Sequence, residues 1–115
     1  MTERLRTKLW SVLTQAGISI ELSEAETNKY PYVTYEMTVN PIRDKDGIRG
    51  YSGITVVRAI SDDFDEADGL ADEVIEVIGD TMMDATFSSR LTAVEKDCVN
   101  GVWTIELNYT LRQFE

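Results

Sequence analysis

The acidic side chains are the most concentrated chemical groups of this sequence. Nine of them, and no base, lie within residues 62–80, in the run DDFDEADGLADEVIEVIGD. Carboxylates can bind metal ions or, in pairs, act as general acid and base. The sequence has no histidine to support such a site, and neither residues 44–47 nor residues 63–65 continue as a calcium-binding loop does. We therefore expect a solvated acidic face, with no metal site and no catalytic residue.

The remaining reactive residues give no better case for an enzyme. Cys98 has acidic neighbours, which disfavour the thiolate that a reactive cysteine needs, so we interpret it as a small buried hydrophobe. Gly47, Gly50 and Gly53 recur every third residue, a spacing that matches neither the dinucleotide-binding nor the P-loop motif. We expect no cofactor, and an enzyme is the least favoured class of function.

Length and charge narrow the class of protein further. The 115 residues are enough for one domain, residues 1–115, with one modest core. The 21 acids against 11 bases give a net charge of −10, which argues against nucleic acid or an anionic membrane as the main ligand. The sequence has no apolar run of membrane-spanning length, its N-terminus lacks the apolar core of a signal peptide, and a single cysteine fits a reducing cytoplasm.

Two stretches have the apolar periodicity of amphipathic helices. Residues 2–16 form the first and residues 62–80 the second, with apolar residues three or four positions apart in each. In the second helix we expect Asp63 at the N-cap and Glu66 to complete a capping box.

Five stretches have the alternating pattern of β-strands. They are residues 18–23, 30–39, 48–60, 87–97 and 102–114. Residues 40–47 are rich in turn-forming residues and predict a loop that joins the second and third strands. Asn100 and Gly101 predict a two-residue type I′ turn between the last two strands. That turn would place Glu95 opposite Glu106, and a bulge or a cation from elsewhere would be needed to relieve their repulsion.

The predicted order of elements is α-β-β-β-α-β-β, which gives an α+β fold of two layers, an antiparallel sheet with helices packed on it. In the strand at residues 48–60, Val57 and Ala59 can face a helix, so Ile54 and Val56 point to the other side. A sheet face in contact with water should be polar. We therefore expect this second face to be covered, either by the N-terminal helix or by a neighbouring subunit.

Three blocks of the sequence together resemble a known family. They are an N-terminal helix followed by a short strand, PYVTYEMTV at the start of a hairpin, and GITVVRAISDDFDEADGLADEVIEVI, where a strand runs into an acidic helix with Phe64 and Ala67 in a Phe-x-x-Ala pattern. The chain then closes with WTIELNYTLRQFE. Over nearly its whole length it resembles the tail-terminator and tail-completion proteins of long-tailed bacteriophages and prophages. The strength of the charge on the acidic helix departs from the family pattern.

The resemblance implies a structural role and no catalytic residue. It implies an α+β subunit that assembles as a ring, typically a hexamer, on the end of the tail tube, where it stops tube growth and offers a docking surface for the head. DNA would pass through the ring without being read. The implied partners are further copies of the chain, the tail-tube protein and a head-completion or neck protein, with no membrane. The implied location is the host cytoplasm during assembly and then the virion tail, or the cytoplasm for a prophage remnant.

By position, the loop and the second sheet face correspond to assembly surfaces of the family. The loop carries Arg43, Lys45 and Arg49, three of the 11 bases. We hypothesise that this basic loop meets the acidic helix, or another acidic surface, of a neighbour, because complementary charge sets register and partner choice. A solvated loop without a partner is the alternative. The residues expected at the interface are Arg43, Lys45, Arg49, Ile54, Val56, Asp68, Asp72 and Glu76.

Two other functions remain open at this point. One is a head–tail joining or neck component with a related fold. The other is a small-molecule-binding or regulatory α+β module of cellular origin, which predicts a ligand pocket between helix and sheet.

Overall fold

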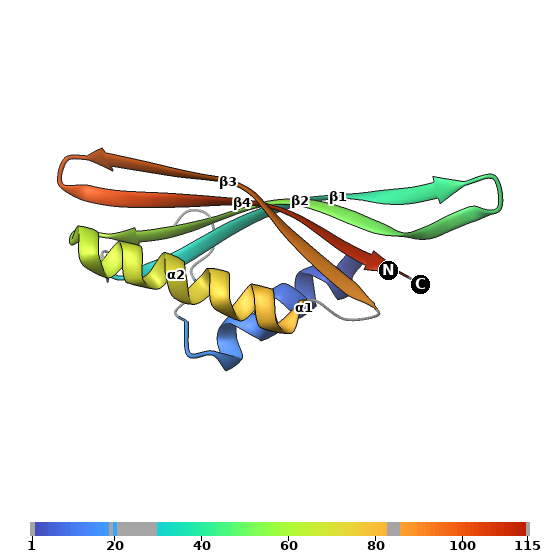
Figure 1. Ribbon diagram of the computed structural model, residues 1–115, viewed down its shortest axis with the longest axis horizontal. Helices are drawn as coiled ribbons and strands as arrows, with labels where there is room; N and C mark the ends of the chain where they lie inside the picture. Colours follow the sequence, from blue (N-terminus) through green and yellow to red (C-terminus); the bar gives the residue numbers. More distant parts are fainter. Residues whose placement is uncertain (1, 19, 21–29, 83–85, 115) are drawn as a thin grey trace.

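The chain folds into two helices packed on one side of a four-stranded antiparallel sheet (Figure 1). This computed structural model describes residues 2–18, 20, 30–82 and 86–114. In chain order the elements are α1 (Thr2–Gln15), β1 (Tyr32–Asp44), β2 (Gly47–Ser61), α2 (Phe64–Thr81), β3 (Phe87–Val99) and β4 (Val102–Phe114). The strands lie in the order β1-β2-β4-β3, so the predicted two-layer α+β fold is confirmed.

The predicted first strand, residues 18–23, differs from the prediction where it can be compared. Ile20 makes one isolated parallel bridge to Val33, and most of the remaining positions lie outside the described residues. Among the described residues the order of elements is therefore α-β-β-α-β-β.

The β1–β2 hairpin is longer than the sequence predicted. Residues 40–44 continue β1 instead of forming a loop, and only Lys45 and Asp46 lie between the two strands. Pro41 is compatible with this because β1 is an edge strand, where a missing N–H costs no ladder hydrogen bond. The two hairpins project toward opposite ends of a molecule that measures 51 × 24 × 22 Å (Figure 1).

The β3–β4 turn and its register follow the prediction closely. Asn100 and Gly101 have φ angles of 53° and 78°, as a type I′ turn requires. Glu95 lies opposite Glu106, as expected. A register shift between Leu91 and Ala93 marks a bulge further along β3.

Helix α2 begins at the predicted N-cap residue, but with different hydrogen bonds from the predicted ones. Asp63 occupies the N-cap position, but its side chain makes no capping hydrogen bond. Instead, the hydroxyl of Ser61 accepts a hydrogen bond from the Asp63 backbone N–H (3.2 Å) and donates one to the Glu66 carboxylate (3.0 Å). The predicted box is wrong because Ser61, the buried last residue of β2, reaches both groups.

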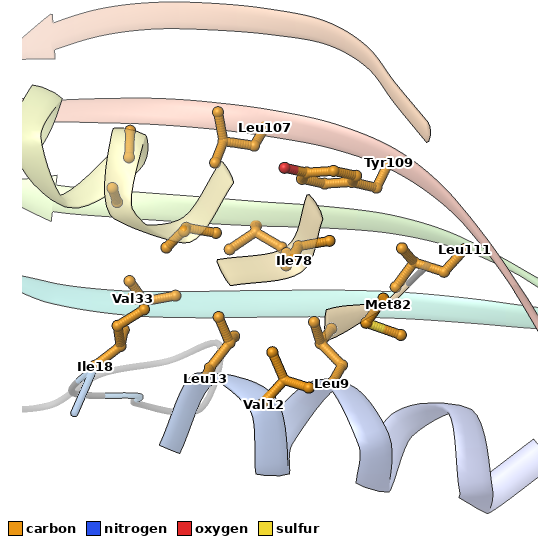
Figure 2. Close-up of a cluster of buried hydrophobic side chains, with 14 of the residues drawn as sticks. Leu9, Val12, Leu13, Ile18, Val33, Ile78, Met82, Leu107, Tyr109 and Leu111 are labelled. Atoms are coloured by element: carbon orange, nitrogen blue, oxygen red, sulfur yellow. The ribbon is translucent and has the colours of Figure 1, made fainter. Parts of the chain in front are cut away.

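The core lies between the helices and one face of the sheet (Figure 2). Val57 and Ala59 of the central strand β2 are fully buried beneath the helices, as predicted. The side chains that meet there come from both helices and from three strands, and they include Leu9, Val12, Leu13, Val33, Ile78, Met82, Leu107, Tyr109 and Leu111. Burial of this apolar surface supplies the main driving force for folding.

Helix α1 packs on the same face of the sheet as α2, beside it (Figure 1). Its apolar stripe, which includes Leu5, Leu9 and Leu13, fills the area of this face that α2 leaves open. The expectation that the N-terminal helix covers the second face is therefore wrong. Ile54 on that face is 61% exposed, and cover by a neighbouring subunit stays a prediction.

Gly50 marks a point where β2 runs very close to β4. A Cβ atom on Gly50 would collide with the backbone carbonyl oxygen of Gln113 and lie 3.2 Å from the Cα of Phe114. Because these are backbone atoms, we expect Gly50→Ala to lower the free energy of unfolding by about 2 kcal/mol or more. Gly69→Ala is the control, since nothing lies within 4 Å of its added Cβ, and should gain about 1 kcal/mol. Denaturant unfolding measures both, and equal stability of the two variants would contradict this account.

The hydroxyl of Tyr109 is buried and, in the described part of the chain, has no hydrogen-bond partner. Burial raises the pKa of Tyr109 from 10.0 to about 12. The unfolded chain therefore loses this proton near pH 10 while the folded chain keeps it, so stability falls as pH rises from 10 toward 12. This fall in the free energy of unfolding amounts to at most about 3 kcal/mol, and we expect Tyr109→Phe to abolish it. At pH 7 the same substitution should be neutral or stabilising. Unfolding curves at pH 7 and pH 11 should show this, and an identical pH dependence in both proteins would argue against it.

Candidate functional site

Neither helix covers the sheet face that points away from them (Figure 1), and we call this face the outer face. On β4 it carries Thr104, Glu106, Asn108, Thr110 and Arg112, and on β2 it carries Ile54, Val56, Arg58 and Ile60. Among them, Ile54 and Val56 are outward positions that the sequence predicted. Small polar residues surround the large exposed side chains, which makes this a mixed surface and not a second core.

One end of the outer face is an ion-pair cluster around Arg58. Its guanidinium lies 3.1 Å from the carboxylate of Glu106 and 3.5 Å from that of Glu36. Glu106 is the residue that faces Glu95 across the β3–β4 hairpin. The sequence predicted that a bulge or a cation from elsewhere would be needed to relieve the repulsion between Glu95 and Glu106. Arg58 is that cation, and its role is structural.

The other end of the outer face is a shallow hollow that we call the arginine patch. It is lined by Ser88, Arg90, Thr92, Thr110 and Arg112. Both arginines are exposed, and neither forms an ion pair with a residue that the structure describes. Their direct cross-strand neighbours are hydroxyl residues, Thr110 for Arg90 and Ser88 and Ser52 for Arg112.

Sequence reasoning did not single out the arginine patch. Arg90 and Arg112 are 22 positions apart in the chain, and only the register of β3 on β4 brings them to one place. The outward position of Arg112 in the alternation of β4 was the one available signal.

The predicted acidic interface residues are not equivalent in the structure. Asp72 and Glu76 are exposed on the side of α2 that faces away from the sheet. Asp68 is instead engaged within the chain, because Lys96 of β3 lies 3.2 Å from its carboxylate. The Lys96 amino group also lies over the Phe64 ring, 5.3 Å from its centroid, so this contact fastens β3 to the start of α2.

The predicted basic loop is the tip of the β1–β2 hairpin. Arg43 lies one residue before the end of β1, opposite Ile48, while Lys45 lies in the turn and Arg49 belongs to β2. The tip also contains Asp44 and Asp46, and Arg49 pairs with Asp44 at 3.2 Å, so its charge is mixed. Figure 1 shows the tip projecting beyond both helices, so the structure does not bring the basic tip and the acidic helix together within one chain.

The other candidate chemistry is weak. Among residues 2–18, 20, 30–82 and 86–114, no three possible metal ligands cluster, and no helix is long and apolar enough to span a membrane. Cys98 is exposed near the end of the edge strand β3, so its interpretation as a buried hydrophobe is wrong. One hollow lies between the two helices, lined in part by Lys8, Gln15 and Asp80. A second hollow lies between α1 and β1, where a small-molecule module was expected to have one, and is lined by Arg6, Thr7, Trp10 and Tyr35.

Comparison with known proteins gives a match in structure alone. No family model and no curated protein sequence matches this chain. Among solved structures, it matches a chain described as the virion of a native gene transfer agent (GTA) particle, with a TM-score of 0.70 and 16% sequence identity. The match covers 96% of this chain and 95% of the other. At that identity the likeness shows a shared fold over nearly the whole of both chains.

The ion-pair cluster can be tested by removing its cation. Arg58→Leu leaves Glu36, Glu95 and Glu106 close together on the outer face without a counter-charge. We expect the free energy of unfolding to fall by about 1–2 kcal/mol. Arg90→Leu is the matched control, because it removes an exposed arginine with no ion pair in the described structure and should change stability by less than about 0.5 kcal/mol. Equal effects in thermal or denaturant unfolding would show that Arg58 has no such role.

Proposed function

We propose that this chain is a structural subunit of a phage or phage-like virion, and that it acts as a tail terminator. In this role it forms a ring on the end of the tail tube, stops tube growth and offers a docking surface for the head. The observation that carries the proposal is the fold shared with a virion chain over 96% and 95% of the two lengths. The sequence blocks that resemble tail-terminator proteins support the finer assignment.

Two features of the isolated chain fit a subunit that is completed by neighbours. Ile54 is 61% exposed beside the partly buried Val56, on a sheet face that neither helix covers. The β1–β2 hairpin projects beyond the core, and a two-stranded ribbon is only marginally stable without contacts (Figure 1). A neighbouring subunit on this face and around this hairpin supplies both missing contacts.

Charge gives the proposed interface its register. The tip residues Arg43, Lys45 and Arg49 meet an acidic surface of a neighbour. Asp72 and Glu76 offer an acidic surface on α2 that forms no ion pair with any described residue. Complementary charges of this kind act on partner choice more than on affinity. Asp68 contributes less, because it is already paired with Lys96.

The proposed subunit performs no reaction and needs no cofactor. Its partners are further copies of itself, the tail-tube protein and a head-completion or neck protein, and DNA passes through the ring unread. It assembles in the host cytoplasm and ends in the virion tail. A head–tail joining or neck protein is the second candidate, because the matched structure is described only as a whole virion particle.

Absolute mass in solution tests ring formation. A hexamer of 13.0 kDa chains has a mass of about 78 kDa, which light scattering over a concentration series resolves from the monomer. We expect a discrete species near this mass, visible as a ring in negative stain. Replacing Arg43, Lys45 and Arg49 with glutamate should shift assembly to higher concentration. If the variant assembles over the same concentration range as the wild type, the tip is not part of the interface.

Capping of tail tubes tests the terminator role itself. Cognate tail tubes incubated with the chain should carry it at one end and should stop growing. Free tube ends, with all of the chain left in the unbound fraction, would contradict the terminator assignment. Binding to the head portal and not to the tube would favour the neck protein.

A further inference from the structure

The arginine patch holds two cations that the rest of the described chain does not neutralise. Arg90 on β3 and Arg112 on β4 occupy diagonal positions on the outer face, where side chains lie about 7–8 Å apart. Both lie on paired strands of the sheet, so the relative position of their backbones is fixed. The patch is therefore preorganised for an anionic partner.

The chemistry of the patch suits carboxylates on a protein surface. Guanidinium groups bind carboxylates in a planar, two-bonded geometry, and hydroxyls can donate to the oxygens that remain. Ser88 and Thr110 flank the arginines and carry such hydroxyls, whereas the Thr92 hydroxyl already donates its proton to the Asn108 carbonyl (3.1 Å). Ile54, beside Thr110, adds an exposed apolar contact at the edge of the patch.

The same chain carries a surface that matches this chemistry. The outward stripe of α2 consists of exposed residues three or four positions apart, namely Asp65, Gly69, Asp72, Glu76 and Gly79. Within the described chain none of its three carboxylates forms an ion pair. The two glycines have open space where a Cβ would be, although glycine costs a helix about 1 kcal/mol relative to alanine. These gaps leave room for partner side chains to approach the helix backbone.

The two surfaces cannot meet within one chain. The stripe lies on the outer side of α2, and the arginine patch lies on the opposite face of the sheet (Figure 1). Contact between them therefore needs a second copy, arranged head to tail. An interface of this type closes into a ring or continues as a filament.

We infer that the acidic stripe of α2 in one copy docks on the arginine patch of the next. The inference deepens the proposed function and rests on it for the ring. It assigns the patch, and not the hairpin tip, as the main complement of α2. The reason is that the tip contains its own acids and already uses Arg49 in an ion pair with Asp44.

The test exchanges the charges of the two surfaces. A patch variant carries Arg90→Glu and Arg112→Glu, and a helix variant carries Asp72→Lys and Glu76→Lys. Each variant alone should assemble about 100-fold more weakly than the wild type, because every interface brings like charges together. An equimolar mixture should regain the wild-type mass by light scattering, since every contact between different variants is again complementary.

A tip variant, Arg43→Glu with Arg49→Glu, is the matched control. It changes the net charge as much as the patch variant does, but mixing with the helix variant should not restore its assembly. Gly69→Gln adds an independent check, since it should raise the unfolding transition slightly, as glutamine favours a helix more than glycine does, and yet weaken assembly about tenfold by filling the gap in the stripe.

The outcomes separate this inference from the proposed function. Assembly of the patch variant at wild-type concentrations would overturn the inference and leave the ring proposal intact. A wild type that stays monomeric at every concentration would also overturn it, while capping of tail tubes would decide the terminator role separately. A short DNA duplex that binds the wild type but not the patch variant, without recovery of mass in the mixture, would overturn it and assign the patch to phosphate. Recovery of mass in filaments would support the inference and contradict the ring.

Discussion

The structure depends on the packing of both helices against the same face of one sheet. The central strand β2 lies beneath them, and Val57 and Ala59 are fully buried at that contact. Leu13 from α1 and Ile78 from α2 complete the same core, so neither helix can leave without exposing it (Figure 2). This arrangement closes one face of the sheet, and neither helix covers the opposite face.

The same arrangement separates the charges of the molecule. The acidic outer side of α2 and the arginine patch end on opposite sides of the sheet, so they do not meet within one chain. The charges that do pair inside the chain hold its parts together. Lys96 fastens β3 to α2 through Asp68, and Arg58 relieves the carboxylates that gather at its end of the outer face. Among the described residues, Arg90, Arg112, Asp72 and Glu76 form no such ion pair.

Local patterns in the sequence predict an element correctly where they agree with its tertiary contacts. The strand β4, the helix α2 and the Asn100-Gly101 turn are all found where the sequence predicts them. The turn depends on residues close together in the chain, and the helix and the strand each bury one clear apolar face. Residues 40–44 were mistaken for a loop because their turn-forming composition outweighed the tolerance of an edge strand for Pro41. The face on which α1 packs depends on contacts between residues far apart in the sequence. The grouping of Arg90 with Arg112 depends on the register of β3 on β4. Neither can be predicted from a local sequence pattern.

The central claim is that the outer face of the sheet is an assembly surface. The most direct test places a single thiol there, as Ile54→Cys in a Cys98→Ser background, and measures its alkylation rate below and above the concentration at which the chain assembles. Ile54 is 61% exposed in the single chain, so the monomer should react rapidly. We expect the rate to fall at least tenfold on assembly. An unchanged rate in the assembled protein would show that this face remains open and would contradict the account.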